Sequence, residues 1–258
     1  MSNKTIEPVP ADFPAGPRLR RYNAIMGSLH GVQAVAILLL TTAFALPVTA
    51  TFLEGPPGTA PAAPRTLFEI RTGWAIAAFF LLSASAHAIL TLPRVNGWYN
   101  RNLARQRNDA RWIEYSLSSS IMIVLIAQLT GISDVAALIA IFGVNTAMIL
   151  FGLVQEHYAR PGGSLLPFWL GCIAGAVPWL AIVVYAASPG LAANPPAFVD
   201  VIIISLFVFF NCFAVNMWLQ YRKVGRWNDY LYGESVYILL SLVAKSLLAW
   251  QIFAGTLT

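Results

Sequence analysis

Seven long apolar segments constrain the fold of this chain more than any other feature of its sequence. A helix crosses a hydrocarbon core of about 30 Å with roughly 20 residues, and each segment is about that long. The composition agrees, with 58% hydrophobic and 10% charged residues, outside the balance of soluble domains. We predict an all-α membrane protein: a cytoplasmic N-terminal lead, residues 1–21, followed by one seven-helix domain, residues 22–258. The predicted spans are approximately 22–46, 70–92, 111–130, 134–157, 165–187, 197–221 and 231–256.

The connection between the first two spans is too long for a tight turn. It contains Glu54-Gly-Pro-Pro-Gly58, and Pro-Gly steps mark turns. Residues 49–53 alternate in a way that suits a strand. We therefore expect a small β-hairpin in the first extracellular loop.

Basic residues are distributed unequally between the two sides of the predicted bundle. Of the sixteen Lys and Arg, thirteen fall on the side of the N-terminus, while Arg65 and Arg71 fall on the other side. The positive-inside rule then places the N-terminus in the cytoplasm and, after seven crossings of the cell membrane, the C-terminus outside. This placement explains the net charge of +5 without a nucleic acid partner. Cys172 and Cys212 lie inside apolar runs and imply no disulfide framework.

The remaining basic residue, Lys245, lies near the middle of the last span. A lysine there costs about 2.5 to 3.5 kcal/mol on insertion, so it indicates a function. It is about 12 residues, or roughly 18 Å, from either end, which is too deep for its stem to reach water. The sequence therefore predicts a buried ammonium group that needs a partner.

Glu114 is the natural partner, because we find no other acid well inside an apolar run and assign Asp134, Glu156 and Asp200 to helix ends. An alternative stays open. Hydropathy places Glu114 only one turn into its span, where it would belong to the cytoplasmic interface beside Arg111. For Glu114 to meet Lys245, the third span must begin earlier or the seventh must sit lower.

Further polar residues lie near these two. Ser118 shares a helix face with Glu114, and Ser241 shares one with Lys245. His30 and His87 fall in the cytoplasmic half at a depth similar to that of Glu114, with Gln33 one turn from His30 and Ser83 one turn from His87. Such a group suits a hydrated pocket that holds or passes a proton. The alternative, in which both histidines bond to backbone or headgroups, also stays open.

Helices four to six carry residues that suit the wall of a site for a long apolar ligand, although each residue type is individually more common in ordinary packing. We find no metal-ligand cluster, phosphate-binding glycine loop or nucleophilic triad in the sequence, so we do not expect an enzyme. The candidate lining residues are Asn145, Met148, Trp179, Phe209, Phe210 and Asn211.

A central lysine on the last helix, one carboxylate on the third and aromatic residues across the fifth and sixth together resemble a retinal-binding rhodopsin. The sequence departs from the usual microbial pattern, since Ser241 rather than Asp precedes the lysine by one turn. It is similar instead to the heliorhodopsin family, and the resemblance extends over all seven helices. The stretches that carry it are Arg111-Trp-Ile-Glu-Tyr-Ser-Leu-Ser-Ser-Ser120, Ile141-Phe-Gly-Val-Asn145 and Ser241-Leu-Val-Ala-Lys-Ser-Leu-Leu-Ala-Trp-Gln251.

The resemblance implies all-trans retinal bound covalently to Lys245 as a protonated Schiff base, with Glu114 as counterion and Tyr115 among the cofactor-binding residues. It implies a cytoplasmic-side cavity with His30 and His87, and homodimers that use the fourth and fifth helices with the first outer loop. It also implies 13-cis isomerisation and a slow photocycle without net ion transport.

Three classes of function compete for this sequence. A photoreceptor would signal to an unidentified cytoplasmic partner. A light-driven pump or channel would need titratable groups on both sides of the Schiff base, and the sequence places them on the cytoplasmic side only. A non-photic transporter would use Lys245 for an anionic substrate, but it would often carry paired discontinuous helices. We favour the photoreceptor.

Overall fold

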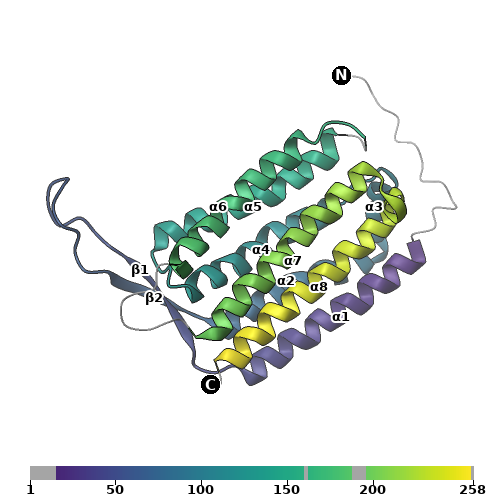
Figure 1. Cartoon of the computed structure of the whole chain (residues 1–258). Coiled ribbons are helices and arrows are strands. Elements are labelled where there is room, and N and C mark those ends of the chain that lie inside the picture. The colour runs from purple at the N-terminus through teal and green to yellow at the C-terminus, as the bar shows by residue number, and fades with distance from the viewer. Residues whose placement is uncertain (1–15, 160–161, 188–195, 257–258) are drawn as a thin grey trace.

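The computed structural model describes residues 16–159, 162–187 and 196–256, which form a bundle of long helices with a two-stranded hairpin at one end (Figure 1). Seven of the helices are long and apolar enough to cross a membrane, as predicted. These seven are α1 (Gly16–Leu40), α2 (Thr72–Thr91), α4 (Asp109–Leu129), α5 (Val135–Tyr158), α6 (Leu166–Ala187), α7 (Ala197–Arg222) and α8 (Tyr230–Gly255).

Six of these helices lie within two residues of their predicted bounds, and α1 is the exception. It begins at Gly16 and ends at Leu40, instead of running from 22 to 46, so part of the predicted lead is helical. The predicted end was wrong because residues 45–50 pair with another strand, a contact that hydropathy does not report. Residues 1–15 of the predicted lead lie outside the described residues.

The predicted hairpin is confirmed, with different bounds. Strand β1 (Ala45–Ala50) pairs antiparallel with β2 (Arg65–Arg71), and Leu46 lies opposite Ile70. The predicted strand residues 51–53 therefore fall in the loop beyond the sheet. The backbone N–H of Thr49 also donates to the carbonyl of Ser133 at 2.8 Å, which fastens the hairpin to the connection before α5.

The connection between α2 and α4 contains a short helix, α3 (Pro93–Ala104), that the sequence interpretation missed. Pro93 occupies the first turn, where its missing N–H costs nothing. Tyr99 and Leu103 are buried in a cluster with Leu19 and Ile238. Burial, together with the nearby Glu234 carboxylate, raises the pKa of the Tyr99 phenol, so the ring stays neutral where it packs. A 12-residue helix rich in Arg and Asn carries no membrane-span signal, which explains the omission.

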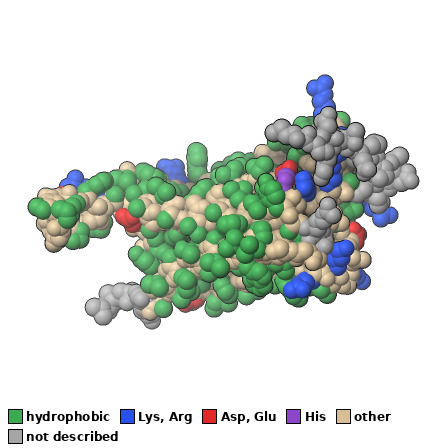
Figure 2. Space-filling view, turned by 90° about the horizontal axis from the view of Figure 1, so that it is seen from above, with side chains coloured by type: hydrophobic (Ala, Val, Ile, Leu, Met, Phe, Trp, Pro, Cys, Tyr) green, Lys and Arg blue, Asp and Glu red, His purple; other side chains and the backbone are tan. Residues whose placement is uncertain are grey.

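The two ends of the bundle differ in charge. We call the end that carries the start of α1, helix α3 and the α7–α8 connection the basic end, and the opposite end the hairpin end. In Figure 2, hydrophobic side chains cover the middle of the visible face, and Lys and Arg gather mostly at the end away from the hairpin. Lys4 and Arg160 are outside the described residues, and Arg65 and Arg71 are at the hairpin end. The basic end carries Arg18, Arg20, Arg21, Arg94, Arg101, Arg105, Arg107, Arg111, Arg222, Lys223 and Arg226.

Helix α4 lies inside the bundle and positions much of the polar interior. Its buried residues run from Arg111 to Gln128 and include Glu114 and three serines. A helix that is buried around most of its circumference has neighbours on all sides. The side chains of α4 therefore contact groups on several other helices, which makes it the organising element of the site.

Candidate functional site

The ammonium of Lys245 and the carboxylate of Glu114 form a buried ion pair. Nζ of Lys245 donates to Oε1 of Glu114 at 3.2 Å and to Oγ of Ser241 at 2.8 Å. The two charged side chains are 4% and 9% exposed. Oγ of Ser83 on α2 donates to the same carboxylate oxygen at 2.6 Å. Glu114 therefore lies inside the bundle, and the alternative that placed it at the interface beside Arg111 is wrong.

The lysine stem closes part of the apparent difference in depth between these two residues. Glu114 lies five residues after the start of α4, and Lys245 lies fifteen after the start of α8. Helical side chains point back toward the helix N-terminus, and the bond to Ser241 shows that the stem runs back by one turn. A second contact holds the two helices in this register, because the Tyr115 hydroxyl donates to the Tyr237 carbonyl at 2.8 Å.

A cavity of about 510 Å³ lies beside the ion pair, among α4, α5, α6, α7 and α8. Its wall is mostly apolar with a few polar groups, and its volume is typical of sites for small organic molecules, roughly 300 to 1,000 Å³. The rings of Trp179 and Phe210 meet edge to face there, with centroids 5.6 Å apart. The predicted site residues that line it are Tyr115, Ser118, Met148, Trp179, Phe210, Asn211, Ser241 and Lys245.

Two of the predicted lining residues do not line this cavity. Asn145 is buried behind the wall, where its Nδ2 donates to Oγ of Ser119 at 2.9 Å and of Ser120 at 3.0 Å, so it fastens α5 to α4. Phe209 packs against the main apolar core, because adjacent residues of a helix point about 100° apart and only Phe210 faces the cavity.

The sequence interpretation also missed several residues of the wall. Phe213 and Met217 follow Phe210 at spacings of three and four, and this spacing could have identified them as members of one helix face. Trp112 and Tyr237 were missed as well, although each is one helical turn or less from a predicted residue.

His30 and His87 lie together, as predicted. Their rings stack with centroids 5.6 Å apart at an angle of 12°, and Nδ1 of His87 is 2.7 Å from Oδ1 of Asn23. His30 is fully buried, and neither of its ring nitrogens has a hydrogen-bond partner among the described residues. Gln33 does not join this pair; it accepts a hydrogen bond from the Trp250 indole at 3.1 Å near the surface.

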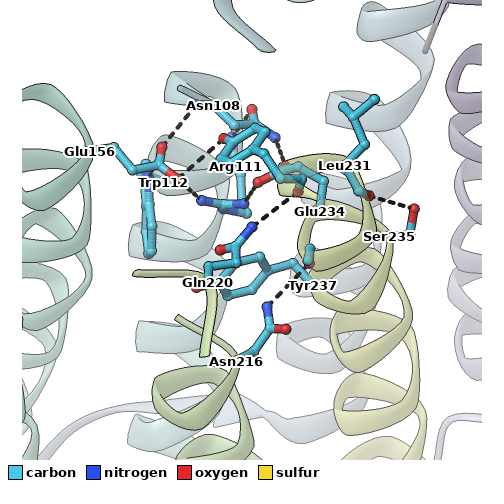
Figure 3. Close-up of polar contacts among 12 residues, drawn as sticks. Asn108, Arg111, Trp112, Glu156, Asn216, Gln220, Leu231, Glu234, Ser235 and Tyr237 are labelled. Atoms are coloured by element: carbon cyan, nitrogen blue, oxygen red, sulfur yellow. Dashed lines mark hydrogen bonds and ion pairs between the residues drawn. The ribbon is translucent and has the colours of Figure 1, made fainter. Parts of the chain in front are cut away.

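A second buried ionic group lies at the basic end, and we call Arg111, Glu156 and Glu234 the arginine clamp (Figure 3). The Arg111 guanidinium pairs with Glu156 of α5 and Glu234 of α8, and all three side chains are at most 4% exposed. Asn108 supports both acids: its backbone N–H donates to Glu156 at 2.9 Å, and its Nδ2 donates to Glu234 at 2.7 Å. The clamp thus joins α4, α5 and α8 at one end of the bundle.

The clamp corrects our assignment of the acidic residues. Glu156 is at a helix end as predicted, but it is buried, and Glu234 was not considered at all. Arg111, which we counted with the interfacial charges, is 6% exposed. Hydropathy could not show this because the three residues are distant in sequence and meet only where the helix ends pack together. One feature of the sequence could have identified the clamp: three predicted spans each carry an ionisable residue near the same end of the bundle.

The clamp and the cavity share two aromatic side chains. Trp112 and Tyr237 line the cavity, and the carbon at the centre of the Arg111 guanidinium lies 4.4 Å and 3.9 Å from the centres of their rings. The indole of Trp112 also donates to Glu156 at 2.7 Å. A displacement of the cavity wall at either ring would therefore act on the clamp directly.

The comparisons with known proteins agree with this arrangement. The family model described as Heliorhodopsin matches residues 19–257, nearly the whole chain. No curated protein matches the chain. The chain belongs to the heliorhodopsin family, whose members are rhodopsin-type light-sensing membrane proteins with a seven-helix bundle and retinal as chromophore.

Proposed function

We propose that this protein is a photoreceptor in which all-trans retinal is bound covalently to Nζ of Lys245 as a protonated Schiff base. The observation that carries the proposal is a buried amine, paired with one buried carboxylate, that faces an apolar cavity of about 510 Å³. A primary amine of this kind condenses with an aldehyde, with loss of water. The aromatic and apolar wall suits a long hydrocarbon chain, and Trp179, Phe210 and Met148 would contact it.

When bound, retinal supplies the absorption of visible light and the photoisomerisation. Glu114 supplies the negative charge that a buried cation requires, since an uncompensated charge in the bundle interior is costly. Oγ of Ser83 donates a hydrogen bond to Glu114 and so orients the carboxylate. Ser241 lies 2.8 Å from the amine and holds its direction, while Tyr115 and Ser118 line the cavity beside it.

His30 and His87 are the groups we propose to hold a proton during the photocycle. They stack inside the bundle on α1 and α2, and Ser83, on the same helix as His87, donates a hydrogen bond to Glu114. A neutral histidine whose ring nitrogens lack a partner among the described residues has a free lone pair that can accept a proton.

We propose that the output leaves through the arginine clamp. Trp112 and Tyr237 form part of the cavity wall and hold the Arg111 guanidinium between them and the two carboxylates. A change in cavity shape would alter the packing of α4 against α5 and α8, and a partner could bind the altered arrangement preferentially. The excess of basic residues at this end supports its location in the cytoplasm, where the signalling partner would bind.

The position of the buried acids supports signalling over net ion transport. Glu114 is itself part of the ion pair, and the other buried carboxylates among the described residues, Glu156 and Glu234, both lie nearer the basic end than this pair. A pump needs titratable groups on both sides. Illuminated cells in unbuffered suspension should therefore show no pH change that a protonophore abolishes, and such a change would restore the pump as the function.

The absorption spectrum of the full-length protein purified with added retinal tests the proposal most directly. We expect a visible band that hydroxylamine bleaches in the light. A protein that binds no retinal, and instead changes its stability with a small organic anion, would support the non-photic transporter. The predicted homodimer through α5, α6 and the hairpin is a separate proposal. Light scattering tests it by measuring the mass of the protein after correction for bound detergent.

A further inference from the structure

The outer face of α3 carries a stripe of exposed basic residues around one tryptophan. Arg94, Trp98, Arg101 and Arg105 are all exposed. Their spacings of four, three and four residues place them on one face of the helix and its C-terminal cap. The stripe is therefore a continuous surface of three guanidinium groups with an indole among them.

The opposite face of α3 is packed firmly onto the bundle. Tyr99 and Leu103 are each 1% exposed, and they lie in one cluster with Leu19, Leu90 and Ile238. Residues of α1, α2 and α8 thus hold α3 in place. The direction of the stripe is consequently set by the fold and does not depend on a flexible loop.

Nothing in the described part of the chain neutralises the stripe. The three arginines form no ion pair with the described residues, and further exposed cations lie nearby. Nε of Arg20 donates to the carbonyl of Thr91, two residues before α3 begins. The acids of this end have other partners: Asp109 pairs with His157, and Asp229 caps α8.

The stripe begins where the apolar surface of a membrane-spanning helix ends. Ile89 and Leu92, at the end of α2, are 50% and 52% exposed, and Trp98 is 38% exposed. Tryptophan concentrates at the level of lipid headgroups, and arginine stems cover apolar surface while the charged group reaches the phosphates. This continuity favours a lipid surface over an acidic protein as the partner.

We propose that the α3 stripe binds the headgroups of anionic phospholipids at the membrane surface. The guanidinium groups would pair with the phosphates, and Trp98 would insert beside them. This site is independent of retinal, so a failure of the photoreceptor proposal would not affect it.

The test uses the full-length protein in neutral detergent, titrated with fluorescent phosphatidylglycerol or with phosphatidylcholine that has the same chains. We expect preference for phosphatidylglycerol that weakens with added salt. Replacing Arg94, Arg101 and Arg105 together by Gln should weaken phosphatidylglycerol binding by roughly a hundredfold, since each basic residue contributes about fivefold. The matched control, Arg65→Gln with Arg71→Gln at the hairpin end, should leave binding unchanged.

Trp98→Ala is a second variant, which keeps all charges, and it should weaken binding of both lipids.

Unchanged helical circular dichroism and monodisperse elution show that the variants are folded. Equal loss in the triple variant and the control, or equal binding of the two lipids, would overturn the proposal. Complete competition by soluble glycerol phosphate would indicate a free phosphate site instead. Polyglutamate, titrated in the same way, serves as a probe for an acidic protein. If the triple variant lost polyglutamate binding but kept phosphatidylglycerol binding, the partner would be an acidic protein instead.

Discussion

Nζ of Lys245 lies 3.2 Å from Oε1 of Glu114, a residue 131 positions earlier in the chain. This contact joins the last membrane-spanning helix to the central one, inside an apolar bundle. The carboxylate oxygen also accepts a hydrogen bond from Ser83, and the ammonium donates a second one to Ser241. Two serines therefore supply further hydrogen bonds to one buried ion pair, and the functional predictions depend on that pair.

Replacing Lys245 should remove the visible absorption of the protein. Lys245→Ala has no amine to condense with retinal, and Lys245→Arg keeps the positive charge beside Glu114 but also lacks a primary amine. We expect neither variant to show a visible band after incubation with retinal. The arginine variant is the control for the lost charge, and a visible band in either variant would contradict the assignment of Lys245.

Replacing Glu114 should change the absorption spectrum of the pigment. Glu114→Gln keeps the size of the side chain but removes the charge that stabilises a buried cation. The band should shift strongly to the red, or the deprotonated form should appear at neutral pH. Glu54→Gln is the matched control, because Glu54 belongs to an exposed pair with Arg65 at the hairpin end. An unchanged spectrum in Glu114→Gln would assign the counter-charge to chloride or another group.

Breaking the arginine clamp should destabilise the bundle. Arg111→Gln leaves Glu156 and Glu234 without their cation, and removing one partner of a buried pair costs about 3 to 5 kcal/mol. Thermal unfolding followed by circular dichroism measures the change.

A matched substitution in an exposed ion pair shows whether the loss of stability in Arg111→Gln comes from breaking a buried pair or from breaking any pair. Arg65→Gln breaks an ion pair whose side chains are 68% and 57% exposed, and such pairs contribute about 0 to 1 kcal/mol. Equal loss of stability in Arg111→Gln and Arg65→Gln would show that the clamp does not hold the helices together.

A single methyl group at Gly152 should disturb both the cavity and the clamp. A Cβ at this position would overlap the ring of Trp112, which lines the cavity and contacts Arg111. Crowding of this kind costs about 1 to 3 kcal/mol, so Gly152→Ala should lower the unfolding temperature and shift the absorption band.

Gly143→Ala is the control on the same helix. An added Cβ at Gly143 meets nothing within 4 Å, and alanine favours a helix over glycine by roughly 0.5 to 1 kcal/mol. The spectrum of this variant should not change. A Gly152→Ala protein that behaves like Gly143→Ala would show that Trp112 moves freely and does not connect the cavity to the clamp.

The sequence by itself determined the seven spans and the loop hairpin, and it singled out Lys245 as a buried cation. These features depend on quantities that a linear chain carries: the length of an apolar run, the presence of Pro-Gly turns and the cost of placing a charge in hydrocarbon. The family resemblance followed from short stretches around Glu114 and Lys245, which are also readable from the chain alone.

Only the tertiary structure decided which groups meet. Lys245 contacts Glu114, and Glu234 is buried in the clamp. Asn145 and Phe209, in contrast, do not line the cavity. Each of these outcomes depends on how a helix is rotated and shifted against its neighbours. Packing between surfaces far apart in sequence sets that rotation and shift, whereas hydropathy averages over a window and does not distinguish one face of a helix from another. Helix α3 was missed for a related reason, because two buried side chains hold it on the bundle and its composition resembles that of a loop.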